Sequence, residues 1–247
     1  MTVINSPHNE QLKEIRKLAG RKWRDKLRQF VAEGEDLLAA AEAAGWPAQA
    51  RFVADGSGLE GVLVAPHILA GVSQLGSSTR ALAVYAQRWA PAPAGPLCLA
   101  LWGVNDPGNV GTALRSALAF GAGSVALGPG SADPYGHKAV RASMGALFQV
   151  PMARARAIEE LPGRRIALVA GRGTPLSELA LDGEVSVVVG AEREGLPAAV
   201  VAACDEQAHI PIRSESLNAA MAATVALYEL NRERSVDERS ARGRMAR

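Results

Sequence analysis

Four apolar runs of strand length constrain the fold of this chain more than any other feature of its sequence. They are LCLALWGV at 97–104, SVALG at 124–128, RIALVAG at 165–171 and VSVVVG at 185–190. A continuous apolar run is typical of a parallel strand that is covered on both faces, whereas a half-solvated strand alternates. The segments between the runs have helical patterns. The sequence therefore predicts an α/β fold with a parallel sheet in its C-terminal part.

A proline-rich stretch, APAPAGP at 90–96, precedes the first of these runs. Its three prolines favour extended backbone and interrupt both helix and sheet. We therefore predict a small α/β domain over 1–90, a linker over 91–96 and a second domain over 97–247. Within the first domain, 9–20 and 34–45 have helical patterns, and the segments ARFVADG and ALAVYAQ are strand-like.

Basic residues gather at both ends of a chain whose formal net charge is only +2. The N-terminal cluster lies between residues 11 and 28, a segment whose only acidic residues are Glu14 and Asp25. It consists of Lys13, Arg16, Lys17, Arg21, Lys22, Arg24, Lys26 and Arg28. The C-terminal cluster consists of Arg232, Arg234, Arg239, Arg242, Arg244 and Arg247. Such clusters suit a polyanion such as nucleic acid. A charge run is also the ordinary composition of a solvated helix face, so composition leaves both interpretations open.

Several classes of protein are disfavoured by what the sequence lacks. Its two cysteines cannot form a disulfide framework, which favours a reducing compartment. The first twenty residues do not resemble a signal peptide and no apolar run is long enough for a bilayer, so we predict a cytoplasmic protein without a membrane partner. The four histidines lack metal-ligand spacing, and no metal is predicted. Dinucleotide, phosphate-loop and nucleophile-elbow motifs are also missing.

Three stretches contain turn residues after a predicted strand and then begin a helix, at 105–123, 185–197 and 209–230. The carboxyl ends of parallel strands meet along one edge of a sheet, and ligands collect there. These stretches therefore form the candidate functional site.

The first stretch, NDPGNVGTALRSALAFGAG, carries one permanent cation, Arg115, among small and apolar residues. Asp106 or Asn109 can cap its helix. Small side chains on one face would let another backbone approach closely, and the predicted buried stripe consists of Val110, Leu114, Ala117 and Leu118. Arg115 can hold a phosphate through two parallel hydrogen bonds, or it can form an ordinary surface ion pair.

The second and third stretches add polar groups beside glycine and a helix mouth. Gly190 lets the main chain approach a ligand closely, and Glu192 follows it. In the third stretch Ser214 or Ser216 is predicted to cap a helix whose buried stripe consists of Leu217, Met221, Val225 and Tyr228. Ser216 and Asn218 would then stand at the helix mouth, where free N–H groups favour an anion or a polar ligand.

The three stretches resemble, in order, the motifs of the SpoU/TrmH family of RNA ribose 2′-O-methyltransferases, part of the SPOUT superfamily. The segments that carry the resemblance are PGNVGTALRSALAFGA, VVVGAEREGLP and IPIRSESLNAAMAATVALYEL. The resemblance covers about residues 97–231. It implies a trefoil knot in the sheet domain, S-adenosylmethionine as cofactor and a homodimer. The segment INSPHNEQLKEIRKLAGRKWRDKLRQFVAEGEDLLAAA is similar to a small RNA-binding module that often precedes this domain. The two-domain layout favours 23S ribosomal RNA as substrate.

The resemblance also implies the roles of individual residues. Arg115 would be catalytic, and the polar set around it would consist of Asn109, Glu192, Ser216 and Asn218. Gly190, Ile210 and Leu217 would hold the cofactor, largely through backbone groups. RNA contacts are predicted for Lys13, Arg16, Lys17, Arg21, Lys22, Arg24 and Arg141.

The implied reaction is attack of a ribose 2′-oxygen on the methyl group of a sulfonium ion. Arg115 would hold an adjacent phosphate and the hydroxyl together, which places the oxygen in line with the methyl carbon. The phosphate itself and a transiently neutral Arg115 are alternative proton acceptors.

Alternatives of the same class are a tRNA 2′-O-methyltransferase and an antibiotic-resistance rRNA methylase. A non-catalytic RNA-binding ribosome assembly factor is an alternative of a different class. The missing dinucleotide fingerprint disfavours a nucleotide-dependent oxidoreductase.

Overall fold

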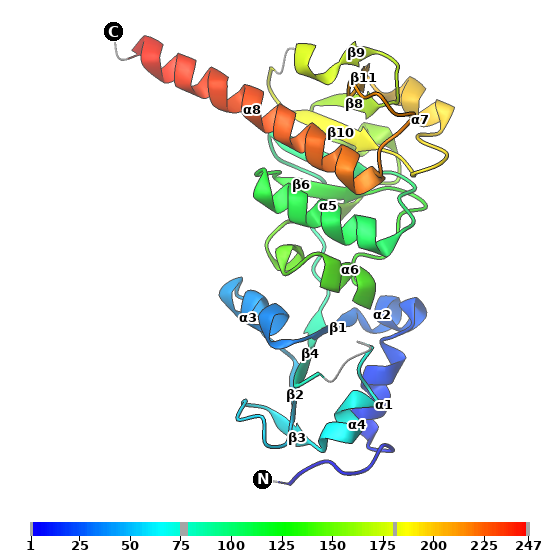
Figure 1. The fold of residues 1–247 in the computed structure, drawn as a ribbon, viewed down its shortest axis with the longest axis vertical. Helices are drawn as coiled ribbons and strands as arrows, with labels where there is room; N and C mark the ends of the chain where they lie inside the picture. The colour runs from blue at the N-terminus through cyan, green and yellow to red at the C-terminus, as the bar shows by residue number, and fades with distance from the viewer. Residues whose placement is uncertain (1, 75–78, 180–181, 246–247) are drawn as a thin grey trace. The chain divides into compact units, whose positions relative to one another are not determined.

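The computed structural model describes residues 2–74, 79–179 and 182–245, with 233–245 described by their backbone only. The chain forms two compact units (Figure 1). Unit 1 consists of Met1–Arg88 together with Asp133–Gln149, and unit 2 consists of Trp89–Ala132 together with Val150–Arg247. Unit 1 therefore contains a segment that lies, in the sequence, between two parts of unit 2.

Unit 1 is a small α/β domain with a four-stranded sheet in the order β1-β4-β2-β3. Strand β4 pairs antiparallel with β1 and β2, and β2 pairs parallel with β3. The elements are α1 (Glu10–Lys17), α2 (Arg21–Leu27), β1 (Gln29–Glu33), α3 (Glu35–Ala43), β2 (Ala50–Ala54), β3 (Val62–Val64), α4 (Pro66–Ala70), β4 (Ala81–Ala86), α6 (His137–Ala142) and the short η1 (Ala146–Phe148). The helices and strands expected before residue 90 are confirmed.

Two clusters of apolar side chains hold unit 1 together. In the first, Leu12 and Ile15 of α1 pack with Phe52 and Leu82 of the sheet. Helix α1 can begin there because Asn9 Oδ1 accepts a hydrogen bond from the N–H of Gln11 over 2.9 Å, which satisfies a free donor of the first turn.

The second cluster is aromatic and explains why residues 133–149 belong to unit 1. The ring centroid of Phe30 in β1 lies 4.8 Å from that of Tyr135, and Tyr85 in β4 lies 5.3 Å from Phe148. Trp46 meets Phe148 edge-on at 5.2 Å. Burial of large aromatic rings removes more apolar area from water than burial of other side chains. These ring contacts therefore attach residues 133–149 firmly to the rest of unit 1.

Unit 2 contains a seven-stranded sheet in the order β7-β6-β5-β10-β8-β11-β9, and every pairing within it is parallel. The α/β class and the parallel sheet are thus confirmed. The elements are β5 (Leu97–Leu101), α5 (Pro107–Ala119), β6 (Ser124–Leu127), β7 (Met152–Arg154), η2 (Ile158–Glu160), β8 (Arg164–Leu168), β9 (Thr174–Pro175), η3 (Leu176–Glu178), β10 (Val185–Val189), α7 (Ala198–Ala203), β11 (Glu206–His209) and α8 (Ala219–Met245).

Helices cover the sheet of unit 2, as the apolar strands require. Cys98, Ala100 and Val188 contribute to a buried cluster against which Val200 and Ala203 of α7 pack. Helix α8 packs against β5 and β10, and it also lies along α5 (Figure 1). Burial of all five residues of β5 and of β10 follows from this arrangement.

The buried face of α8 differs from the prediction. Met221, Val225 and Tyr228 are exposed, and the buried residues are Ala219, Ala220, Ala223, Ala226, Leu227 and Leu230. On α5, Leu118 is likewise exposed, while Val110, Leu114 and Ala117 are buried as predicted. The reason is the close approach of the two helices, which only small side chains permit. The hydroxyl groups of Ser116 on α5 and Thr224 on α8 lie 2.6 Å apart.

Candidate active site at three strand-to-helix junctions

The mouth of α5 is shaped by a cap and a proline. Asp106 is the N-cap, and its Oδ1 accepts a hydrogen bond over 2.9 Å from the backbone N–H of Asn109. Pro107 opens the helix, where its missing N–H costs nothing because that donor has no partner within a helix. Of the two predicted caps, Asp106 has this role, which leaves the side chain of Asn109 free for other contacts.

The side chain of Asn109 joins all three junctions. Its Nδ2 donates a hydrogen bond to Oε1 of Glu192, in the loop after β10. Its Oδ1 accepts one from Nδ2 of Asn218, at the mouth of α8, over 3.1 Å. We call Asn109, Glu192 and Asn218 the polar triad. These residues lie 83 and 109 positions apart in the sequence, and the carboxyl edge of the parallel sheet brings them together.

Asn218 also starts α8. Its Oδ1 accepts hydrogen bonds from the backbone N–H groups of Ala220 and Met221, over 3.0 and 3.3 Å. The prediction that Ser214 or Ser216 caps this helix is wrong, because the helix begins only at Ala219. An asparagine caps a helix as well as a serine does, and here its amide nitrogen remains available for Asn109.

A cavity of about 530 Å³ opens beside the triad. The loops after three adjacent strands, β8, β10 and β11, and the start of α8 form its walls. Five of the predicted site residues line it, namely Gly190, Glu192, Ile210, Ser216 and Leu217. Leu168, the last residue of β8, and Arg172, in the loop after it, line it as well and were not predicted. The rule that ligands collect at strand ends applies equally to RIALVAG, so the sequence contained a signal for them.

Gly190 is required for a reason other than the one expected. A Cβ atom there would lie 2.4 Å from the carbonyl carbon of Gly195, which is far below van der Waals contact. The backbones of Ala191 and Gly195 exchange two hydrogen bonds, over 3.2 and 3.0 Å. The loop therefore folds back tightly on Gly190, and this closure places Glu192 beside Asn109.

Arg115 stands apart from this cavity. It is exposed on α5 and is not among the residues that line the cavity. Within the described parts of the chain, its guanidinium makes no hydrogen bond or ion pair. It follows Asn109 by six residues, which corresponds to about 9 Å along the helix axis. One chain alone thus brings together Asn109, Glu192, Ser216 and Asn218, but leaves Arg115 facing solvent.

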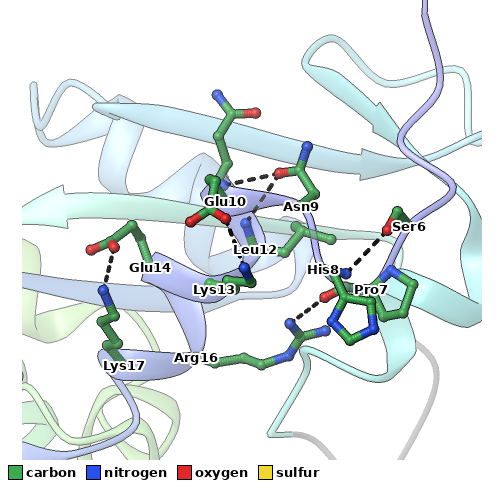
Figure 2. Close-up of polar contacts among 11 residues, drawn as sticks. Ser6, Pro7, His8, Asn9, Glu10, Leu12, Lys13, Glu14, Arg16 and Lys17 are labelled. Atoms are coloured by element: carbon green, nitrogen blue, oxygen red, sulfur yellow. Dashed lines mark hydrogen bonds and ion pairs between the residues drawn. The ribbon is translucent and has the colours of Figure 1, made fainter.

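The cations predicted to contact RNA all belong to unit 1. Figure 2 shows that two of them reach back along α1 to acidic partners: Lys13 lies 2.7 Å from Glu10, and Lys17 lies 2.5 Å from Glu14. Arg16 donates to the carbonyl oxygen of Pro7 over 2.7 Å. Exposed pairs of this kind are weak, so a phosphate can replace either acid.

Helix α2 and α6 carry the remaining predicted contacts. Arg21 lies 3.6 Å from Asp25 and is exposed, as are Lys22 and Arg141. In the C-terminal cluster, Arg232 pairs with Glu229 over 2.5 Å. The later arginines of α8 have only their backbone described, and Arg247 lies outside the described residues.

Arg24 is a correction to the predicted RNA contacts. It is only 6% exposed, and its Nε donates to Asp133 Oδ2 over 2.8 Å. Its Nη1 donates to the carbonyl oxygens of Leu18 and Ala19, over 2.8 and 2.7 Å. A guanidinium that is buried and saturated in this way holds unit 1 together and is not available to a phosphate.

The described part of the chain contains neither a metal-binding cluster nor a membrane-spanning helix. Its His, Cys, Asp and Glu side chains form no group of three or more that is close enough to hold a metal ion. None of its helices has the length and apolar character needed to cross a bilayer.

Comparison with known proteins agrees with this architecture. Residues 96–228 match the model of the SpoU rRNA Methylase family, and residues 9–93 match that of the MRM3-like substrate binding domain. The 23S rRNA (guanosine(2553)-2′-O)-methyltransferase RlmP of Bacillus subtilis is 28% identical over 93% of this chain and 99% of its own.

Two solved structures extend the likeness to the fold. An AdoMet-bound rRNA methyltransferase from Sinorhizobium meliloti is 28% identical with a TM-score of 0.84, over 94% of this chain and 97% of its own. The SpoU methyltransferase AviRb from Streptomyces viridochromogenes, in complex with AdoMet, is 25% identical with a TM-score of 0.83, over 92% and 98%. The chain belongs to the SpoU rRNA methylase family.

Proposed function

We propose that this protein transfers a methyl group from S-adenosylmethionine to a ribose 2′-hydroxyl of 23S ribosomal RNA. The observation that carries the proposal is the polar triad beside the cavity, since it joins the three motif stretches of the family at one edge of the sheet. Membership of the SpoU family and the likeness to RlmP over nearly the whole chain support the same activity and substrate.

The cavity fits S-adenosylmethionine. Leu168, Ile210 and Leu217 offer apolar walls to an adenine ring. Within the described chain, no hydrogen bond engages the backbone of Ile210 or Leu217, so their N–H and C=O groups can pair with the edge of the base. Gly190, Ile210 and Leu217 are therefore the proposed cofactor residues. When bound, the cofactor supplies an electrophilic methyl group on a sulfonium ion.

The residues of this chain would prepare the nucleophile. Arg115 holds the phosphate next to the reacting ribose and fixes the 2′-oxygen in line with the methyl carbon. The hydrogen bonds of the polar triad fix the N-terminal ends of α5 and α8 relative to each other. Ser216 offers a hydroxyl group at the cavity wall.

We propose that the protein acts as a homodimer, through the exposed apolar side chains of α5 and α8. On α8, the side chain of Met221 is 62% exposed and that of Tyr228 is 53% exposed, and Val225 is exposed as well. On α5, Leu118 is exposed. Exposed large apolar groups concentrated in this way are typical of protein interfaces. Pairing through this face would bring Arg115 against the partner protomer, which accounts for its place outside the cavity of its own chain.

Three finer features belong to the same proposal. The loops around the cavity would form the trefoil knot that the family resemblance implies. The predicted cations other than the buried Arg24 would contact RNA phosphates, namely Lys13, Arg16, Lys17, Arg21, Lys22 and Arg141. A cytoplasmic location is supported by the free thiols of Cys98 and Cys204.

The test is transfer of radiolabelled methyl groups to in vitro transcribed, unmodified 23S rRNA, followed by mapping of 2′-O-methyl ribose by mass spectrometry. We expect one modified nucleotide. Calorimetry with S-adenosylmethionine provides the second measurement. Binding without transfer to any RNA would favour a non-catalytic assembly factor, and the absence of both would reject the proposal.

A further inference from the structure

Unit 1 contains a cavity of about 390 Å³ that the proposed chemistry does not use. It lies where the end of α3 and the following turn meet β2 and β4, and Leu38, Trp46 and Pro47 form its apolar part. Arg51 and Glu42 contribute the charged part and lie 4.0 Å apart. We call this space the Tyr85 pocket.

Tyr85 gives the pocket a polar group without a partner. Its side chain is buried at 2% exposure, and its ring packs against Phe30 at 5.7 Å and Phe148 at 5.3 Å. The residue nevertheless lines the pocket, and no hydrogen bond to its hydroxyl is found in the described part of the chain. A hydroxyl group that faces a pocket and has no protein partner can donate and accept hydrogen bonds with a ligand or with water.

The charges around the pocket are mostly positive. Arg88 lies over the ring of Trp46, with its guanidinium carbon 4.4 Å from the ring centroid. Together with Arg51 it places two cations near an opening that carries one acid, Glu42. Burial raises the pKa of Tyr85, so its hydroxyl stays protonated and can both donate and accept.

We propose that the Tyr85 pocket receives one unstacked nucleobase of the RNA substrate. This inference rests on the proposed function and adds a recognition site to it. The apolar walls suit a flat heterocycle, the hydroxyl of Tyr85 pairs with its hydrogen-bonding edge, and Arg51 contacts the flanking phosphate. Proteins that recognise single-stranded RNA commonly bind splayed bases in this way, beside aromatic and arginine side chains.

The test measures RNA binding by the full chain without depending on turnover. The probe is in vitro transcribed, unmodified 23S rRNA, in filter binding at fixed salt. Tyr85→Phe removes only the hydroxyl, and we expect about five-fold weaker binding, as for one lost hydrogen bond. Arg51→Ala should weaken binding to a similar extent, and because the side chain of Arg51 is 35% exposed this variant should fold even if the tyrosine variant does not.

Arg80→Ala is the matched control. Arg80 is an exposed arginine of the same unit, paired with a single glutamate, Glu35, over 3.0 Å, and it is not among the residues that line the pocket. It should bind RNA as the unchanged protein does. Photocrosslinking with 4-thiouridine in the transcript, followed by peptide mapping, should identify the segment 45–51.

The outcomes separate this inference from the proposed function. If the wild type binds and methylates RNA while Tyr85→Phe and Arg51→Ala bind equally well and crosslinks fall elsewhere, the pocket proposal is wrong and the methyltransferase stands. Crosslinks at 45–51 together with weaker binding, but without any methyl transfer, would support the pocket and reject the enzyme. A chain that binds no RNA would overturn both.

Discussion

The side-chain amide of Asn218 donates a hydrogen bond to Oδ1 of Asn109 over 3.1 Å, while its own oxygen caps α8. One side chain therefore both starts a helix and attaches that helix to the mouth of α5. Because Asn109 in turn holds Glu192, the position of the loop after β10 depends on the same residue.

These two roles of Asn218 can be separated by substitution. Asn218→Ala removes the cap and the link, so we expect the free energy of unfolding to fall by about 1 kcal/mol and methyl transfer to fall about ten-fold or more. Asn218→Ser restores a capping oxygen but is too short to reach Asn109. It should recover stability in urea denaturation and remain slow. Wild-type transfer by the serine variant would show that the link is dispensable.

Arg115 should matter for transfer and not for folding. It is exposed and has no ion pair within the described chain, so Arg115→Ala should leave the free energy of unfolding nearly unchanged. Transfer should fall by about 100-fold or more, as for loss of a group that positions the reacting atoms. Arg156→Ala, at another exposed arginine of unit 2, is the control. Unaltered turnover in the Arg115 variant would remove this residue from the mechanism.

Arg24 should show the opposite behaviour. Arg24→Ala leaves Asp133, whose side chain is only 11% exposed, without its cation, and removes the donor to the carbonyl oxygens of Leu18, which is buried, and of Ala19. We expect a loss of about 3–5 kcal/mol in the free energy of unfolding. Arg21→Ala, three residues earlier and exposed, should cost less than about 1 kcal/mol. Urea denaturation of both variants measures the difference, and equal losses would contradict the structural role of Arg24.

The proposed dimer depends on the outer face of α8. Met221→Glu places a charge on that face, and desolvating it in an interface is unfavourable, so sedimentation should change from dimer to monomer. Met144→Glu is a matched control, because Met144 in unit 1 is 60% exposed and Met221 is 62% exposed. A Met221→Glu protein that stays dimeric would exclude this face as the interface.

Low pH should weaken the ion pair of Arg165 with Asp205, which lies at the amino ends of β8 and β11. Arg165 donates to both carboxylate oxygens of Asp205, over 2.7 Å each, and these bonds lower the pKa of Asp205 to about 2 from the usual 3.8. Because the folded pKa is the lower one, the pair stabilises above about pH 4, and this stabilisation is lost as the pH falls from about 4 to about 2. The carboxylate is partly exposed, so the contribution is no more than about 1 kcal/mol.

Asp205→Asn tests this dependence. It should flatten the decline of the free energy of unfolding between about pH 4 and 2. Urea denaturation at several pH values measures the slope, while methyl transfer at neutral pH should be unaffected. A variant with the same acid slope as the wild type would show that other carboxylates dominate.

Local patterns predicted the elements of this protein well. The four apolar runs are β5, β6, β8 and β10, because a strand that is covered on both faces must be apolar throughout. Two of the three motif stretches were recognisable for a similar reason, since they place polar residues shortly after β5 and β10. The third follows β11, which is short and mostly polar. The predicted sheet type and the edge that carries the site both followed from these runs.

Patterns of apolar residues predicted the buried face of α8 wrongly. Met221, Val225 and Tyr228 have the periodicity of a core stripe, yet the core uses the alanines beside them. Periodicity identifies an apolar face without saying which surface covers it. Close packing of α8 on α5, with Ser116 against Thr224, decided the orientation.

The sequence by itself determined which segments become strands and helices, and that the chemistry gathers where parallel strands end, because these depend on residues close together in the chain. Only the tertiary structure decided that Asn109 joins Glu192 and Asn218, that Arg24 is buried against Asp133, and that residues 133–149 pack with Phe30 and Tyr85. The residues of each pair lie far apart in the sequence, by 83 positions for Asn109 with Glu192 and by 109 for Asn109 with Asn218 and for Arg24 with Asp133. Their formation depends on how whole elements pack, and no local pattern encodes it.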